Sequence, residues 1–311
     1  MSGQQSRYCR VEPIFNLKTP LLFAHRGGAL EVPESTVKGF RHAIENARSD
    51  VLELDVQLTR DGELVVWHGP DLDNVRIDGQ NNCPAKRPKK RRKIYHYEWK
   101  ELDGKAWVAD PRAKTPEEDE IDLSGTPVSE DRRLLLLSDF LDKFPNIPLN
   151  IEMKQSFKRK IDDANRAGSK DNIRLLTGIL DNDSSKRKIV IVSAHDGLID
   201  EFRELNGEKY PTGLSIREQL AFQFFDRDMR NRVLETSYDH HFSGRKLIER
   251  AARLGGATFV FLTGFGPVLP AIDNPPKEEE IFEVLDRGVD GIMTDRPKRL
   301  REIIDKWQAL A

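Results

Sequence analysis

The sequence predicts an α/β protein, a slightly irregular (β/α)8 barrel of the TIM type with a long insertion after the third strand. Short apolar segments of strand length alternate with amphipathic segments of helix length along most of the chain, and there are about eight of the former. Such alternation indicates a parallel sheet covered by helices, and eight repeats favour a closed barrel over an open sheet. With 311 residues the chain is long enough for one such domain, which we place at residues 21–311.

The first repeat follows a polar lead-in over residues 1–20. Residues 21–24 form a short apolar strand that ends in His25 and Arg26, directly before a glycine turn. A helix over residues 37–47 comes next, because apolar residues recur there at helical spacing and Ser35 or Thr36 can cap its start.

The second strand, residues 51–58, carries the most informative pattern. Apolar and polar residues alternate, so Glu53 and Asp55 lie on one face. Neither has a Lys or Arg neighbour at strand spacing, and two acids in a mostly buried strand need a cation to offset the cost of desolvation. A divalent metal is the natural candidate. A turn at residues 59–62 then returns the chain as a hairpin that ends at His68, an imidazole that could reach whatever the metal holds.

Beyond His68 the pattern fails over residues 69–131, which we interpret as an insertion, and then resumes. One later strand carries Glu152 and Lys154 on a single face. Like the residues above, they lie near the carboxyl end of a strand, where such barrels build their active sites. The remaining expected helices are 134–144, 155–182, 198–205, 245–254, 278–286 and 297–310, and the remaining strands are 148–154, 188–193, 212–216, 257–262 and 290–295.

Composition excludes several classes of protein. Lys and Arg total 50 against 52 for Asp and Glu, so no global field marks a nucleic-acid binder. Cys9 and Cys83 lack the spacing of a zinc site or a disulfide framework. The sequence shows no signal-peptide pattern and no apolar run long enough for a transmembrane segment, so we expect a cytoplasmic protein. The basic run 86–93 leaves a nuclear address or a peripheral contact with an anionic membrane open.

Six ordered motifs together resemble the glycerophosphodiester phosphodiesterase family, over about residues 21–306 apart from the insertion. They are His25-Arg26-Gly27, Pro33-Glu34-Ser35-Thr36, Glu53-Leu54-Asp55-Val56, Val65-Val66-Trp67-His68, Asn150-Ile151-Glu152-Met153-Lys154 and the segment from Gly288 to Pro297.

The resemblance implies a TIM-barrel enzyme that hydrolyses glycerophosphodiesters to sn-glycerol 3-phosphate and an alcohol with one divalent ion, Mg2+ or Ca2+. In its terms the metal ligands are Glu53, Asp55 and Glu152, the acid–base pair is His25 and His68, and the phosphate contacts are Arg26 and Lys154. We assign His68 as the base and His25 as the acid. Carboxylates suit such a hard cation, and two imidazoles can take and give the protons of the reaction.

Two departures from the family pattern keep rival functions open. Gly69 stands where the family usually has Asp, and the family's Trp-Thr-Val-Asn element is not recognisable near residues 259–274. One rival is lysophospholipase D-like activity on lysophospholipids, which an apolar groove lined by Phe259, Phe261 and Phe265 would favour. The other is a catalytically silent, metabolite-binding relative. The head group and the oligomeric state are left open.

Other polar residues receive structural interpretations. His195 ends a strand but is expected to be scaffold, and Glu34 is expected to be a hydrogen-bond acceptor near the first turn. The adjacent histidines His240 and His241 would point apart in any regular structure, and we expect them to lie in a loop.

Overall fold

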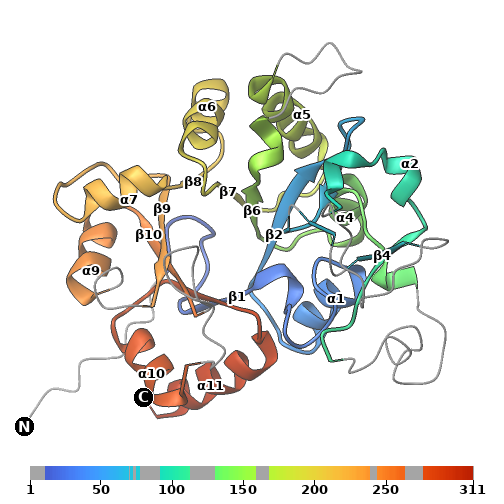
Figure 1. The fold of residues 1–311 in the computed structure, drawn as a ribbon. Coiled ribbons are helices and arrows are strands. Elements are labelled where there is room, and N and C mark those ends of the chain that lie inside the picture. Colours follow the sequence, from blue (N-terminus) through green and yellow to red (C-terminus); the bar gives the residue numbers. More distant parts are fainter. Residues whose placement is uncertain are drawn as a thin grey trace, which may run out of the picture.

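Eight parallel strands close into the predicted barrel in the computed structural model, which describes residues 11–69, 71–72, 75–77, 92–112, 130–158, 168–238, 244–262 and 276–310. Each strand pairs with the next one around the barrel, and the last pairs with the first. Figure 1 looks along the barrel, whose strands surround the centre. In order around the barrel they are β1 (Leu21–Ala24), β2 (Val51–Leu58), β6 (Leu149–Met153), β7 (Ile189–Val192), β8 (Thr212–Gly213), β9 (Arg232–Ser237), β10 (Ala257–Phe261) and β11 (Gly291–Thr294).

Helices form an outer ring around these strands (Figure 1). Their apolar faces bury residues such as Phe40, Leu176 and Ile304 against the outward-facing residues of the barrel. In the described part of the chain, no helix combines the length and the apolar character needed to cross a membrane. The main helices are α1 (Val37–Glu45), α4 (Leu137–Lys143), α5 (Ser169–Asn182), α6 (Asp196–Asn206), α7 (Ile216–Phe222), α9 (Arg245–Arg253), α10 (Glu278–Asp286) and α11 (Pro297–Ala309).

The end of the barrel where the strands begin is filled by apolar side chains, including those of the lead-in. Phe15 is buried, and its ring centroid lies 5.9 Å from that of Phe23 and 5.8 Å from that of Phe259. Ile14 joins the same cluster. The described part of the lead-in is irregular, as expected. Its apolar side chains also pack into the core and fill this end of the barrel.

The sequence-based prediction was wrong about two of the strands. It counted the segment after residue 62 as one of the eight barrel strands. That segment, β3 (Leu64–Val66), pairs antiparallel with β2 and lies outside the closed barrel. This pairing agrees with the predicted hairpin. It also gave no element at β9, which is the missing eighth strand. This strand escaped notice because Arg232 and Glu235 interrupt its apolar pattern, and α7 before it was missed as well.

The predicted helix over 155–182 is divided. Residues 155–158 form a short 3-10 turn and α5 starts only at Ser169, while residues 159–167 lie outside the described ranges.

The described part of the insertion has structure of its own. Strands β4 (Val75–Ile77) and β5 (Ala106–Val108) form a small antiparallel sheet, accompanied by the short helix α2 (Trp99–Leu102). Their apolar side chains pack with Trp67 in a separate cluster beside the β2–β3 hairpin. Most of the basic run, residues 86–91, and both cysteines lie outside the described residues.

Candidate active site

Three carboxylates meet near the end of the barrel where β2 and β6 finish. The two strands are parallel neighbours, and their register places Asp55 opposite Glu152 and Glu53 one step below on the same face. One oxygen from each of the three lies within 4.8 Å of the others. Glu53 and Asp55 are buried, whereas Glu152 is partly exposed. The structure therefore brings together the three residues that the sequence suggested as metal ligands.

Two basic side chains stand among these acids. Lys154 Nζ lies 2.8 Å from an oxygen of Asp55 and 2.8 Å from an oxygen of Glu152. Arg26 Nε lies 3.3 Å from Asp55, and its Nη1 donates to Glu34 at 3.2 Å. The acids therefore do have basic neighbours, which strand spacing could not reveal because Lys154 directly follows the adjacent strand and Arg26 comes from the first turn. Glu34 is an acceptor for Arg26, in agreement with its structural interpretation.

The turn after β1 is shaped to hold both of its functional residues. Arg26 has φ 52°, a left-handed conformation that is costly for a residue with a side chain. In this conformation its backbone N–H donates to Glu53 at 2.9 Å, and its carbonyl accepts from Ser35 N–H. Thr36, one of the two expected caps, accepts from Gly39 N–H at the start of α1. The strained turn is therefore fixed from both sides.

His25 is oriented by a carboxylate that was not assigned from the sequence. Its Nδ1 lies 2.6 Å from Asp295, at the end of β11, and its Nε2 faces Glu53 at 3.8 Å. Burial and the Arg26 guanidinium lower the pKa of His25, but Asp295 and Glu53 outweigh them and raise it above its usual value. Asp295 stood in the last of the six motifs, so its place at a strand end was the available signal.

His68 lies in the opposite electrostatic situation. Burial lowers its pKa to about 3, with Arg26 and Lys154 acting in the same direction against the attraction of Asp55. The imidazole is therefore neutral at pH 7. The side chain of Gln57, which lies on the same face of β2 as the acids, donates to the carbonyls of His68 and Gly69 and fixes the chain there. Gln57 is a second residue that was missed from the sequence.

A divalent cation fits the chemistry of this site. Neither oxygen of the buried Asp55 carboxylate accepts a hydrogen bond of good geometry, although Lys154 and Arg26 lie within ion-pair distance. Burial and the Asp55 carboxylate raise the pKa of Glu53 to about 8, so the site needs more positive charge before all its acids ionise. Carboxylate oxygens are the donors that Mg2+ and Ca2+ prefer.

A fourth acid, Glu235, lies on the opposite wall of the barrel. It is buried, and its side chain accepts a hydrogen bond from Asn150, the residue paired with Glu53 in the strand register. Burial raises the pKa of Glu235 to about 8, with Glu152 and Glu53 adding to the effect. This residue was missed from the sequence together with its strand.

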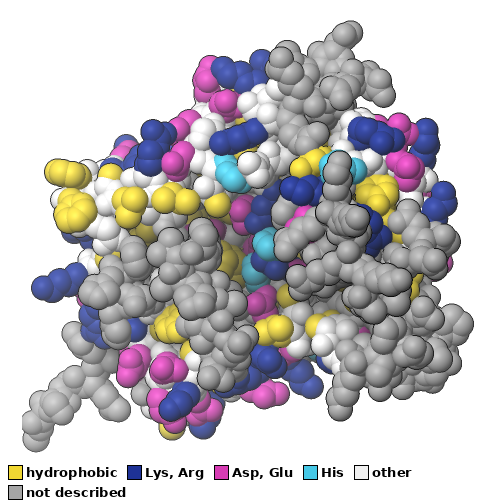
Figure 2. All heavy atoms as spheres, viewed as in Figure 1, with side chains coloured by type: hydrophobic (Ala, Val, Ile, Leu, Met, Phe, Trp, Pro, Cys, Tyr) yellow, Lys and Arg dark blue, Asp and Glu magenta, His cyan; other side chains and the backbone are white. Residues whose placement is uncertain are grey.

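The remaining expectations divide between core and site. Phe259 is fully buried in the barrel interior, so it lines no groove, whereas the Phe261 ring lies edge-on to His25 at 6.0 Å. Phe265 and the pair at 240 and 241 lie outside the described residues. His195 occupies the N-cap position of α6, where its side chain makes no capping hydrogen bond and its backbone N–H donates to Ser193 at 3.1 Å. Figure 2 shows histidine, basic and acidic side chains gathered near the centre of the face viewed along the barrel.

Comparisons with known proteins find relatives that match most of this chain. The human protein named lysophospholipase D GDPD1 is 26% identical over 310 residues, which cover 92% of this chain and 86% of that protein. The glycerophosphoryl diester phosphodiesterase domain of a Mycobacterium tuberculosis protein superposes with a TM-score of 0.65 at 12% identity and covers 91% of this chain and 98% of that one. An Oleispira antarctica phosphodiesterase, solved with the product sn-glycerol-3-phosphate, has a TM-score of 0.63 at 15% identity, with 92% and 97% covered.

These structural likenesses establish the same fold. The family model described as "Glycerophosphoryl diester phosphodiesterase family" matches residues 25–299, from the first histidine of the site to within the last helix. That range includes both histidines, the three carboxylates and the insertion. The chain therefore belongs to the glycerophosphoryl diester phosphodiesterase family, a family of phosphodiester hydrolases.

Proposed function

We propose that this protein is a metal-dependent phosphodiesterase that hydrolyses glycerophosphodiesters to sn-glycerol 3-phosphate and an alcohol. The observation that carries the proposal is the convergence of Glu53, Asp55 and Glu152 beside a histidine paired with a carboxylate. In this proposal the three carboxylates hold one divalent ion, Mg2+ or Ca2+. When bound, that ion polarises a phosphoryl oxygen and neutralises developing negative charge.

The side chains of the protein supply the remaining steps. Arg26 and Lys154 bind the phosphate, since their cationic groups already lie among the acids that border the site. His68, neutral at pH 7, takes the proton from the attacking hydroxyl. His25, whose pKa Asp295 and Glu53 raise, gives a proton to the leaving alkoxide. The two opposite pKa shifts support the assignment of His68 as base and His25 as acid.

A second candidate substrate class is lysophospholipids. The support comes from relatives that are named lysophospholipase D, including human GDPD1 over most of this chain. The same acids and histidines would cleave the head group from a lysophospholipid, because the scissile phosphodiester bond is of the same type. The two activities differ in whether an acyl chain must be accommodated next to the phosphate.

The test is product release from two substrates, glycerophosphocholine and lysophosphatidylcholine. We expect activity with added Mg2+ or Ca2+, its loss on chelation, and a fall of at least about 1,000-fold in Glu53→Gln, because a neutral amide is a poor ligand for a hard cation. Glu45→Gln, an exposed acid on α1, serves as the matched control and should retain full activity. Absence of activity with every metal and both substrates would favour the silent relative.

A further inference from the structure

One segment of the surface is unusually apolar. Seven large hydrophobic side chains are exposed in the described part of the chain, and four of them, Ile216, Leu220, Phe224 and Phe225, fall within α7 and the turn that follows it. The two phenylalanines are 80% and 70% exposed. Ile216, Leu220 and Phe224 are four residues apart, so they share one side of the helical segment. We call these four residues the α7 ridge.

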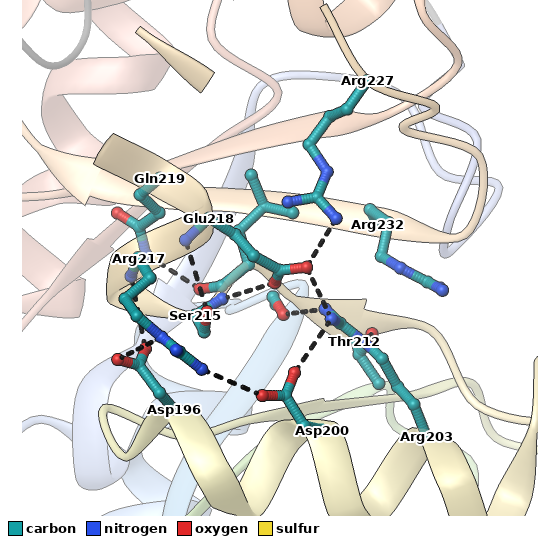
Figure 3. A network of polar contacts seen from close by, with 12 residues as sticks. Asp196, Asp200, Arg203, Thr212, Ser215, Arg217, Glu218, Gln219, Arg227 and Arg232 are labelled. Carbon is teal, nitrogen blue, oxygen red and sulfur yellow. Dashed lines mark hydrogen bonds and ion pairs between the residues drawn. The ribbon is translucent and has the colours of Figure 1, made fainter. Parts of the chain in front are cut away.

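The ridge is exposed because the opposite side of α7 is fixed to the protein. Phe222 is fully buried on that side, and the Phe225 N–H still donates to the Ala221 carbonyl at 3.0 Å. Glu218 forms ion pairs with Arg203 at 2.8 Å and with Arg227 at 2.5 Å, as Figure 3 shows. The phenylalanines are therefore held outward by an ordered helical turn.

The ridge lies on the side of the molecule that carries the candidate site. Only two residues separate the end of β8 from the start of α7, and Ser215 caps the helix, so its first turn is next to the carboxyl end of a barrel strand. In Figure 2, which has the same view as Figure 1, yellow side chains over α7 form a band from the rim towards the centre, where the charged side chains gather. An apolar path thus leads towards the mouth of the barrel.

The charges beside the ridge are balanced. Arg217 pairs with Asp196 at 3.2 Å and with Asp200 at 3.3 Å (Figure 3), and Arg230 pairs with Asp228 at 2.6 Å. These arginines have acidic partners in place and do not form a free basic patch that would select anionic lipids. An apolar surface with a neutral surround suits a zwitterionic lipid.

The size of the ridge argues against a stable protein partner. A standard interface buries about 800 Å² on each side, whereas a whole aromatic side chain buries about 150–250 Å². Four partly exposed side chains therefore fall short of that area. Insertion of a few apolar side chains into a lipid surface has no such requirement.

We propose that the α7 ridge docks this protein on a zwitterionic lipid bilayer, with Phe224 and Phe225 inserted between the head groups. This part does not depend on enzymatic activity. A second part rests on the proposed function: docking directs the mouth of the barrel to lysophospholipids that lie in the bilayer, while water-soluble glycerophosphodiesters reach the site without it.

The experiment measures sedimentation of the full chain with phosphatidylcholine vesicles at low and high salt. We expect binding that changes less than about 2-fold with salt, since it is driven by apolar insertion. The double variant Phe224→Ser/Phe225→Ser should bind at least about 10-fold more weakly, because two aromatic side chains no longer insert. The matched control is Val11→Ser/Leu310→Ser, which alters two other exposed apolar residues and should bind like the parent.

Each opposing outcome overturns the proposal. Equal binding by the double variant and the control would do so, and so would binding that requires anionic lipid and disappears at high salt. A parent dimer that the double variant converts to a monomer, with no vesicle binding by either, would assign the ridge to a second copy of this chain. If the protein binds vesicles but hydrolyses no substrate, the proposed function is wrong and the docking proposal still holds.

For the second part, the double variant should hydrolyse glycerophosphocholine at the parent rate but should lose at least about 5-fold activity on lysophosphatidylcholine presented in vesicles. This loss follows from weaker docking. Equal losses on both substrates would contradict a role in delivery. A second variant, Leu220→Gln, should show a smaller change in the same direction, because it shortens the ridge without touching either aromatic ring.

Discussion

Replacement of Asp295 by Asn tests the pairing on which the proposed acid depends. Asp295 accepts from His25 Nδ1 at 2.6 Å, and both side chains are largely buried, so solvent screens the pair weakly. A hydrogen bond between charged partners contributes about 1.5–3 kcal/mol, and 1.36 kcal/mol corresponds to one pKa unit. The amide preserves the shape but loses the charge. We therefore expect the pKa of His25 to fall by about 1 to 2 units.

The direction of the kinetic effect follows from the role of His25 as an acid. The acid must be protonated to act, so its pKa sets the alkaline limb of the pH profile of kcat/KM. Asp295→Asn should move that limb to lower pH by about 1 to 2 units and, at pH values above both limbs, reduce kcat/KM by about 10- to 100-fold. The assay is choline release from glycerophosphocholine between pH 5 and 9, together with NMR titration of the His25 ring.

A matched substitution separates catalysis from stability. Asp50 is also a carboxylate next to a barrel strand, but at the opposite end, where it accepts from Leu22 N–H and from Arg301. Asp50→Asn should lower thermal stability and leave the pH profile in place. If the alkaline limb of Asp295→Asn also stays in place, the proton donor is some group other than a His25 held by Asp295.

Three further substitutions test the fold and the buried charges. Phe15→Ala should destabilise the protein by about 3–5 kcal/mol in urea unfolding, because it empties the closed end of the barrel; a loss under 1 kcal/mol would show that the lead-in is dispensable. Glu218→Gln should cost about 1–3 kcal/mol in the same assay, since Arg203 and Arg227 lose their shared partner, with no change in the hydrolysis of glycerophosphocholine. The pKa of Glu235 is raised to about 8, so folding favours its protonated form and the free energy of unfolding falls as pH rises from about 5 to 8. Glu235→Gln should make that fall shallower by on the order of 1 kcal/mol or more. An unchanged pH dependence would mean that Glu235 ionises normally.

Periodicity in the sequence was sufficient to predict the arrangement of the site residues that lie within one strand. Alternation along β2 placed Glu53 and Asp55 on one face, and both are buried there, as expected. Ordered motifs added Glu152, but no feature of the sequence revealed the register that sets it opposite Asp55. That register depends on how the strands pair when the barrel closes, and pairing is a property of the whole sheet.

Residues that act across the barrel were the ones that sequence reasoning missed. Glu235 interrupts the apolar pattern of β9, which made the strand unrecognisable, and its partner Asn150 comes from the other side of the closed sheet. Asp295 joins His25 between the last strand and the first, from opposite ends of the chain. Local pattern carries no information about such partners, because closure of the barrel alone brings them together.

The sequence indicated a metal at Glu53 and Asp55 even though it could not reveal their basic neighbours. The sequence suggested that Glu53 and Asp55 had no basic neighbours, yet Lys154 and Arg26 both contact Asp55 and hold its pKa below the usual range against the effect of burial. These two cations do not neutralise the whole cluster, because Glu53, which burial and Asp55 disfavour as an anion, has a pKa raised to about 8. The negative charge that these cations leave unbalanced is that of Glu53, which lies between the other acids and His25. A divalent ion would supply that charge, so the basic side chains would complement such an ion and would not replace it.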